Sequence, residues 1–205
     1  MKFLLPPGRA SQWLAGACDW AVIACGWWLI ALSVVTCIEM LGRKLFGFSL
    51  QGVDEIGAYT YGLVGAFGFA YTLVTRSHTR VDFLLSRFAP RVRAWLNLGA
   101  MLSLAAVALL CVWRAWAVVQ ESVEMHSTAA TPLATPMWIP QSLWLVGYGF
   151  FALVAMWASG YALWLMARGK IEALNHGFGP QTLEEEIASE TEVQIAPGHS
   201  PAKAP

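Results

Sequence analysis

Apolar residues in this chain are gathered into four long runs separated by short polar segments. The runs cover about residues 20–41, 54–74, 95–119 and 143–166. A helix rises by about 1.5 Å per residue, so a run of about 20 residues crosses the hydrocarbon of a bilayer. The pattern therefore predicts an all-α integral membrane protein with four transmembrane helices.

A shorter segment between the second and third runs has helical periodicity as well. Val81, Leu84, Leu85 and Phe88 follow the spacing i, i+3, i+4 and i+7, which places them on one face of a helix. Pro90 limits the length of this helix, so it is too short to cross a membrane. We expect a short amphipathic helix in the cytoplasmic interface, with nearby arginines reaching the lipid headgroups.

The second run carries a small side chain at every fourth position, at Ala58, Gly62, Ala66 and Ala70. Residues at i and i+4 lie on one helix face, and small residues let another helix approach closely in lipid. Glycine is also common in membrane helices for no specific reason. The regular spacing favours a packing face.

Basic residues set the expected orientation. Five arginines fall in and just after the loop 76–82, whereas only Arg43 and Lys44 follow the first run. Membrane proteins retain their basic loops on the cytoplasmic side. We therefore expect both termini and the loop 76–82 in the cytoplasm, and the connections 42–53 and 120–142 on the outer side.

Several charged residues lie near the outer ends of the predicted spans. Glu39 and Arg43 are four residues apart and could form an ion pair. Asp54 and Glu55 begin the second run, where acids interact favourably with the positive end of a helix dipole. Arg114 in the third run either extends outward to the interface or pairs with an acid on a neighbouring helix. These charges are either ordinary interfacial groups or residues that fix an outer corner against a partner.

The composition supports a membrane location and indicates two parts of the chain. Hydrophobic residues make up 57% and charged residues 13%, whereas soluble domains carry about 25% charged residues. No basic face suits nucleic acid, so we expect no nucleic-acid partner. Residues 1–170 form the predicted transmembrane domain. Residues 171–205, with an acidic patch at 184–192 and a Pro- and Ala-rich end, predict a disordered cytoplasmic tail.

The sequence contains no recognisable catalytic constellation. All four histidines lie outside the predicted spans, where they cannot serve as axial haem ligands within a bundle. The four cysteines form no CxxC motif, and we interpret them as small apolar side chains. GxSxG, HExxH and nucleotide-binding glycine motifs do not occur. We expect no enzyme activity, cofactor or metal site, and a subunit that packs against something larger.

Three groups of residues occur in order along the runs: one after the first run, one after the second and one before the fourth. They are Arg43, Phe46, Ser49, Asp54 and Glu55; Arg76, His78, Val81 and Asp82; and Thr131, Pro136 and Trp138.

These groups resemble motifs of the small membrane subunit of tripartite ATP-independent periplasmic (TRAP) transporters, the DctQ-like family. The resemblance covers about residues 20–166. It implies a subunit of the bacterial inner membrane that extends a fixed scaffold, while a large membrane subunit carries the substrate and sodium sites. It also implies a periplasmic binding protein that delivers an organic acid such as a dicarboxylate, with uptake driven by an ion gradient.

The resemblance and the charge pattern together give eight candidates for subunit contacts or structural roles. They are Glu39, Arg43, Asp54, Glu55, Arg76, His78, Asp82 and Arg114. A different hypothesis, suggested by the acidic patch at 184–192, is a non-catalytic anchoring or interaction subunit of another membrane complex.

Overall fold

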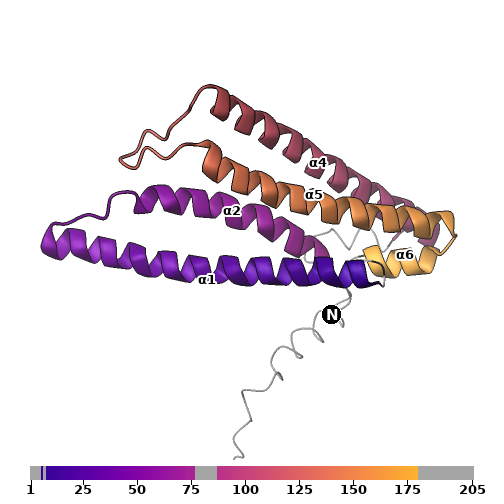
Figure 1. Cartoon of the computed structure of the whole chain (residues 1–205). Helices are drawn as coiled ribbons and strands as arrows, with labels where there is room; N and C mark the ends of the chain where they lie inside the picture. The colour runs from indigo at the N-terminus through magenta and orange to yellow at the C-terminus, as the bar shows by residue number, and fades with distance from the viewer. Residues whose placement is uncertain (1–5, 7, 77–86, 180–205) are drawn as a thin grey trace, which may run out of the picture.

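The computed structural model describes residues 6, 8–76 and 87–179, and most of these residues are helical (Figure 1). The described part contains no β-strand, only one isolated bridge between Thr128 and Pro136. The prediction of an all-α protein is therefore confirmed. The helices are α1 (Arg9–Phe46), α2 (Val53–Val74), α4 (Pro90–Glu124), α5 (Trp138–Ala167) and α6 (Ile171–Phe178).

Three of the described helices, α1, α4 and α5, are long and apolar enough to cross a membrane. α2 is not among them, because four glycines and several tyrosines and threonines lower its mean hydropathy. Its 22 residues nevertheless extend for about 33 Å at ~1.5 Å per residue. The number of four spans stays a prediction.

Three helices are longer than the apolar runs that predicted them. α1 has 38 residues, α4 has 35 and α5 has 30. α2 nearly coincides with the predicted run 54–74. Hydropathy marks only apolar segments, whereas a helix continues through polar residues that find a partner. Ser11, for example, is buried in the additional turns of α1, and its Oγ accepts a hydrogen bond from Trp157 Nε1.

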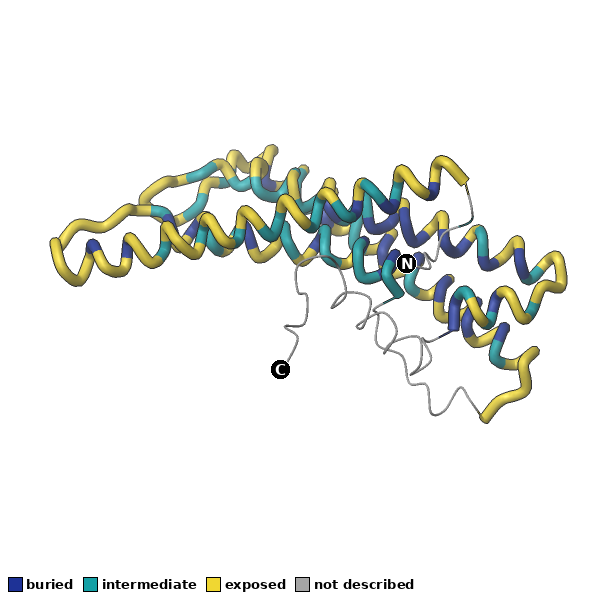
Figure 2. The backbone as a smooth tube through the Cα atoms, turned by 90° about the horizontal axis from the view of Figure 1, so that it is seen from below, coloured by how far each residue is buried: buried dark blue, intermediate teal, exposed yellow. Residues whose placement is uncertain are grey.

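The helices pack as a row. α1 packs against α2, α2 against α5 and α5 against α4, while α6 contacts both α4 and α5 (Figure 1). We call the end with the segments 47–52 and 125–137 the connection end, and the opposite end the α6 end. The buried residues gather toward the α6 end, where α1 begins and α2 finishes (Figure 2).

Small side chains bring the helices together within this core. Ser159 on α5 donates a hydrogen bond to the backbone oxygen of Met101 on α4, at 3.0 Å. A Cβ atom added to Gly147 of α5 would lie 2.7 Å from the Cβ of Ala66 on α2. Such close approach is how helices associate in lipid. The buried alanines of α4 and α5 are Ala94, Ala105, Ala108, Ala115, Ala152, Ala155, Ala158 and Ala162.

The predicted packing face of α2 is only half buried. Ala66 and Ala70 are buried, but Ala58 and Gly62 are exposed. With 3.6 residues per turn, each step of four residues rotates the side chain by about 40°. Ala58 and Ala70 therefore point about 120° apart, and one neighbouring helix cannot cover both.

The prediction that the chain is disordered from residue 171 onward is wrong for 171–179. Ile171, Leu174 and Phe178 share one face of α6, and Leu174 and Phe178 are buried. The ring of Phe178 also lies near Tyr161 of α5, with 6.1 Å between centroids. The remainder of the predicted tail lies outside the described residues, as does most of the predicted amphipathic helix.

Candidate functional site

The first polar cluster lies at the end of α1 and centres on Glu39. Glu39 is only 4% exposed, and its Oε1 accepts hydrogen bonds from Arg43 Nη2 and from Ser49 Oγ, the latter at 3.1 Å. The ion pair predicted from the spacing of Glu39 and Arg43 is confirmed. Because the Arg43 side chain is mostly exposed, we expect this pair to contribute at most about 1 kcal/mol.

Two glycines let the following segment fold back onto α1. Gly47 has φ 70° and ends the helix in the left-handed conformation that favours glycine. The ring of Phe48 lies against Gly42, where an added Cβ would be 2.5 Å from its Cζ. Phe48 and Ser49 therefore hold the connection against the last turns of α1.

The second polar cluster joins α2 to the distant segment 125–137. Glu55 is 6% exposed, and its carboxylate accepts hydrogen bonds from Tyr59 Oη, at 2.7 Å, and from Thr131 Oγ1. The Tyr59 hydroxyl also lies 3.7 Å from Met137 Sδ. Thr131 is 76 positions away in the chain, so Glu55 links the first turn of α2 to the distant segment 125–137.

The segment 125–137 is itself ordered by backbone hydrogen bonds. Ala129 N donates to Thr135 O and Met137 N donates to Ser127 O, both at 2.9 Å. Its Leu133 side chain lies directly on Gly52, the residue before α2, which has φ 99°. A side chain at Gly52 would meet both a strained backbone and an occupied space. The two connections thus form one packed unit.

A third polar cluster joins α2 to α6 at the opposite end. Arg76 has φ 61°, and its Nη2 donates hydrogen bonds to the backbone oxygens of His176, at 2.8 Å, and Gly179. These carbonyls lie at the negative end of the α6 dipole, where a cation is favourable. Asn175 Nδ2 also donates to Pro90 O at 2.8 Å, which links α6 to the start of α4.

The remaining candidates lie apart from these clusters or outside the described residues. Asp54 is exposed in the first turn of α2. Arg114 is also exposed, with its guanidinium 5.8 Å from the centroid of the Trp113 ring. His78 and Asp82 lie outside the described residues, so their roles stay predictions.

The sequence identified the acidic members of the clusters and the Arg43 partner of Glu39, but not the partners Ser49 and Thr131. Glu39 and Glu55 were candidates, whereas the contacts made by Ser49 and Thr131 require the fold. The motif order was the available signal, because both residues belong to the groups that resemble the small TRAP subunit. Arg76 is a candidate too, but its partner helix α6 falls within the predicted tail.

Long apolar helices, small-residue contacts and polar clusters at the helix ends define this chain as an all-α membrane protein. A family model described as "Tripartite ATP-independent periplasmic transporters, DctQ component" matches residues 32–165. The chain belongs to this family, which confirms the resemblance. Members of the family are components of transporters. Both clusters at the connection end lie within the match, and α6 lies beyond it. A comparison with curated proteins found no match.

Proposed function

We propose that this chain is the small permease subunit of a TRAP transporter and acts as the fixed scaffold for the large membrane subunit. The complex would take up an organic acid of the dicarboxylate type, driven by an ion gradient and delivered by a periplasmic binding protein. The chain would cross the bacterial inner membrane with α1, α2, α4 and α5. Both termini would lie in the cytoplasm, so that the connection end faces the periplasm.

The exposed apolar surface of α1 is the main observation that supports the scaffold role. Its most apolar stretch of 18 residues contains no buried residue, and α2 is its main neighbour. Trp27 and Ile30 within this region are 69% and 56% exposed. A row of helices leaves two broad apolar faces, which require lipid or another membrane protein to cover them.

The distribution of charge supports a scaffold over a solute path. In the described residues, α5 contains no charged side chain, and α2 carries its charges only in the first turn. Charged groups within membrane segments commonly mark the paths of ions and anionic substrates. We therefore place substrate binding in the large subunit.

Deletion and complementation test this function. Uptake of a labelled dicarboxylate is measured in cells that lack the chain and in cells that regain it, and the chain is purified with an affinity tag. We expect uptake to be lost, then restored, and a 1:1 complex with the large membrane subunit. Normal uptake without the chain, or co-purification with an unrelated membrane complex instead, would favour the anchoring subunit.

A further inference from the structure

Contacts between neighbouring helices fix how far each helix is shifted along its own axis relative to its neighbour. Trp28 Nε1 on α1 donates to Thr60 Oγ1 on α2 at 2.9 Å, and Gly147 of α5 lies against Ala66 of α2. Ala66 is six residues from Thr60 toward the α6 end. Because α1 runs antiparallel to α2, the same step from Trp28 reaches Val22. Val22 of α1 and Gly147 of α5 are therefore level.

From this level, the apolar stretches of α1 and α5 run in opposite directions. The most apolar stretch of α1 contains no buried residue, so it falls between the buried residues Cys18 and Glu39, mostly toward the connection end. The apolar run 143–166 of α5 extends mostly toward the α6 end. α4 follows α5, because Ser159 contacts Met101. A bilayer perpendicular to the helix axes could not cover both stretches completely, because its hydrocarbon is only about 30 Å thick.

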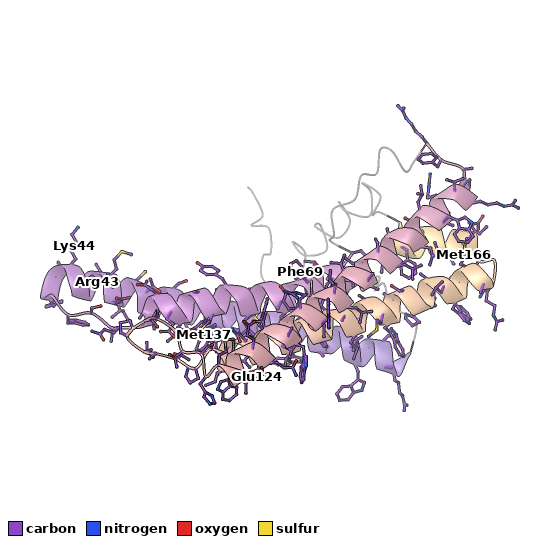
Figure 3. All side chains as sticks on the ribbon, turned by 90° about the horizontal axis from the view of Figure 1, so that it is seen from above. Arg43, Lys44, Phe69, Glu124, Met137 and Met166 are labelled. Carbon is purple, nitrogen blue, oxygen red and sulfur yellow. The ribbon has the colours of Figure 1, made fainter. Side chains whose placement is uncertain are left out.

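The charged residues at the connection end show the same shift. Arg43 and Lys44 lie at the tip of α1, beyond Met137 and Glu124 (Figure 3). The exposed carboxylate of Asp54 on α2 is level with Val34, by the same contact of Trp28 with Thr60. Nine residues, or about 13 Å, separate that level from Arg43. An upright bilayer with its surface at Arg43 would bury Asp54 in hydrocarbon.

The charged residues at the α6 end are shifted in the matching sense. Trp157 Nε1 on α5 donates to Ser11 Oγ on α1 at 3.3 Å, so the exposed Arg9 lies close to the level of Trp157. Arg168 follows Trp157 by eleven residues, or about 16 Å. An upright bilayer with its surface at Arg168 would immerse Arg9.

We infer that the helices lie obliquely in the bilayer. Their axes are tilted away from the bilayer normal by more than the ~20° that is average for membrane helices. The inference rests on the membrane location in the proposed function, not on transport. Inclination reduces the difference in depth between the apolar stretches of α1 and α5. It also reduces the difference in depth between Arg43 and Asp54, and that between Arg9 and Arg168. The acyl chains then cover an oblique apolar belt.

The lengths of the helices agree with this disposition. α1, α4 and α5 have 38, 35 and 30 residues, which correspond to about 57, 52 and 45 Å. The hydrocarbon of a bilayer is about 30 Å thick. Inclination lets most of each helix remain within the membrane.

Spin labels at four exposed positions separate the oblique from the upright disposition. By the contacts above, Trp13 is level with Met156, and Ile30 is level with Ile139; all four side chains are at least 40% exposed. Each position is changed to cysteine in a chain whose own four cysteines are replaced by serine or alanine. The background removes Cys18, Cys25, Cys37 and Cys111.

Depth in liposomes is measured from collisions with oxygen and with a water-soluble nickel complex. In the oblique disposition, labels at Ile30 and Met156 are both deep, while those at Trp13 and Ile139 lie near opposite surfaces. Equal depths within the level pairs, Trp13 with Met156 and Ile30 with Ile139, would overturn the inference.

Oriented circular dichroism of the unmodified chain in aligned bilayers gives a second measurement that needs no variant. We expect a mean helix inclination above about 30°, and a value of about 20° or less would overturn the inference. Neither measurement reads transport. An oblique chain that fails to support uptake would refute the proposed function alone.

Discussion

Gly147 of α5 and Ala66 of α2 are in direct contact, because a Cβ on Gly147 would lie 2.7 Å from the Cβ of Ala66. At Gly149, two residues further along α5, an added Cβ would have no atom of another element within 4 Å. We expect Gly147→Ala to lower the free energy of unfolding by about 1–3 kcal/mol through overpacking. Gly149→Ala should be neutral or stabilise by up to about 1 kcal/mol, because alanine favours helix. Unfolding in detergent measures both, and equal effects would refute the close contact.

The Arg76 side chain should hold α6 in place. Arg76→Ala removes the donor to the carbonyls of His176 and Gly179, and hydrogen bonds from charged groups contribute about 1.5–3 kcal/mol. We expect faster trypsin cleavage at Arg168 and Lys170, followed by mass spectrometry. The exposed Arg91 is the control. Cleavage that is equally fast in Arg76→Ala and Arg91→Ala would contradict the role of Arg76.

Truncation should distinguish α6 from the chain beyond it. Deleting residues 171–205 removes the buried side chains of Leu174 and Phe178, each of which contributes a few kcal/mol when truncated. We expect this deletion to lower the unfolding temperature and the yield of the complex, and deletion of 180–205 to leave uptake unchanged. Loss of uptake with the shorter deletion, at normal stability, would favour the anchoring hypothesis.

Glu55 and Thr131 should be coupled in stability. A double-mutant cycle with Glu55→Gln and Thr131→Val tests the hydrogen bond that joins α2 to the segment 125–137. We expect a coupling energy of about 1–2 kcal/mol in unfolding measurements. The exposed neighbour Asp54 serves as the control, and Asp54→Asn should change stability by less than about 0.5 kcal/mol. Additive effects in the cycle would show that the hydrogen bond contributes little.

Asp54, rather than Glu55, should matter for contacts with other proteins. Its carboxylate is exposed at the connection end, whereas Glu55 is engaged with Tyr59 and Thr131. We expect Asp54→Lys to reduce uptake by about tenfold, or about 1.4 kcal/mol, with normal insertion and normal stability. Glu124→Lys reverses another exposed acid at this end and should leave uptake unchanged. Equal uptake by the two variants would make Asp54 an ordinary interfacial acid.

Hydropathy was sufficient to place four of the helices, because lipid selects apolar side chains along most of each one. It could not place their ends, since buried residues such as Ser11 continue a helix without adding to its apolar run. α6 was missed because its eight residues include Glu172, Asn175 and His176. The spacing of Ile171, Leu174 and Phe178 was the signal that was available.

Local spacing also predicted only part of the polar clusters. The pair of Glu39 and Arg43 follows from one helical turn. The contacts of Glu39 with Ser49 and of Glu55 with Thr131 depend on how the connections fold back and on which helices become neighbours. No periodic pattern in the sequence shows which helices and connections become neighbours.

The contacts of Arg76 also constrain the order of events during synthesis. Arg76 accompanies the end of α2, yet its acceptors at His176 and Gly179 are 100 and 103 positions later in the chain. At about 5–20 residues per second, the ribosome needs roughly 5–20 s to produce them. In the proposed topology, α2, α4 and α5 would enter the membrane during that interval, before this cluster can form. The polar cluster at the α6 end can therefore form only after α6 has been synthesised, and in the proposed topology α6 would join helices that are already inserted.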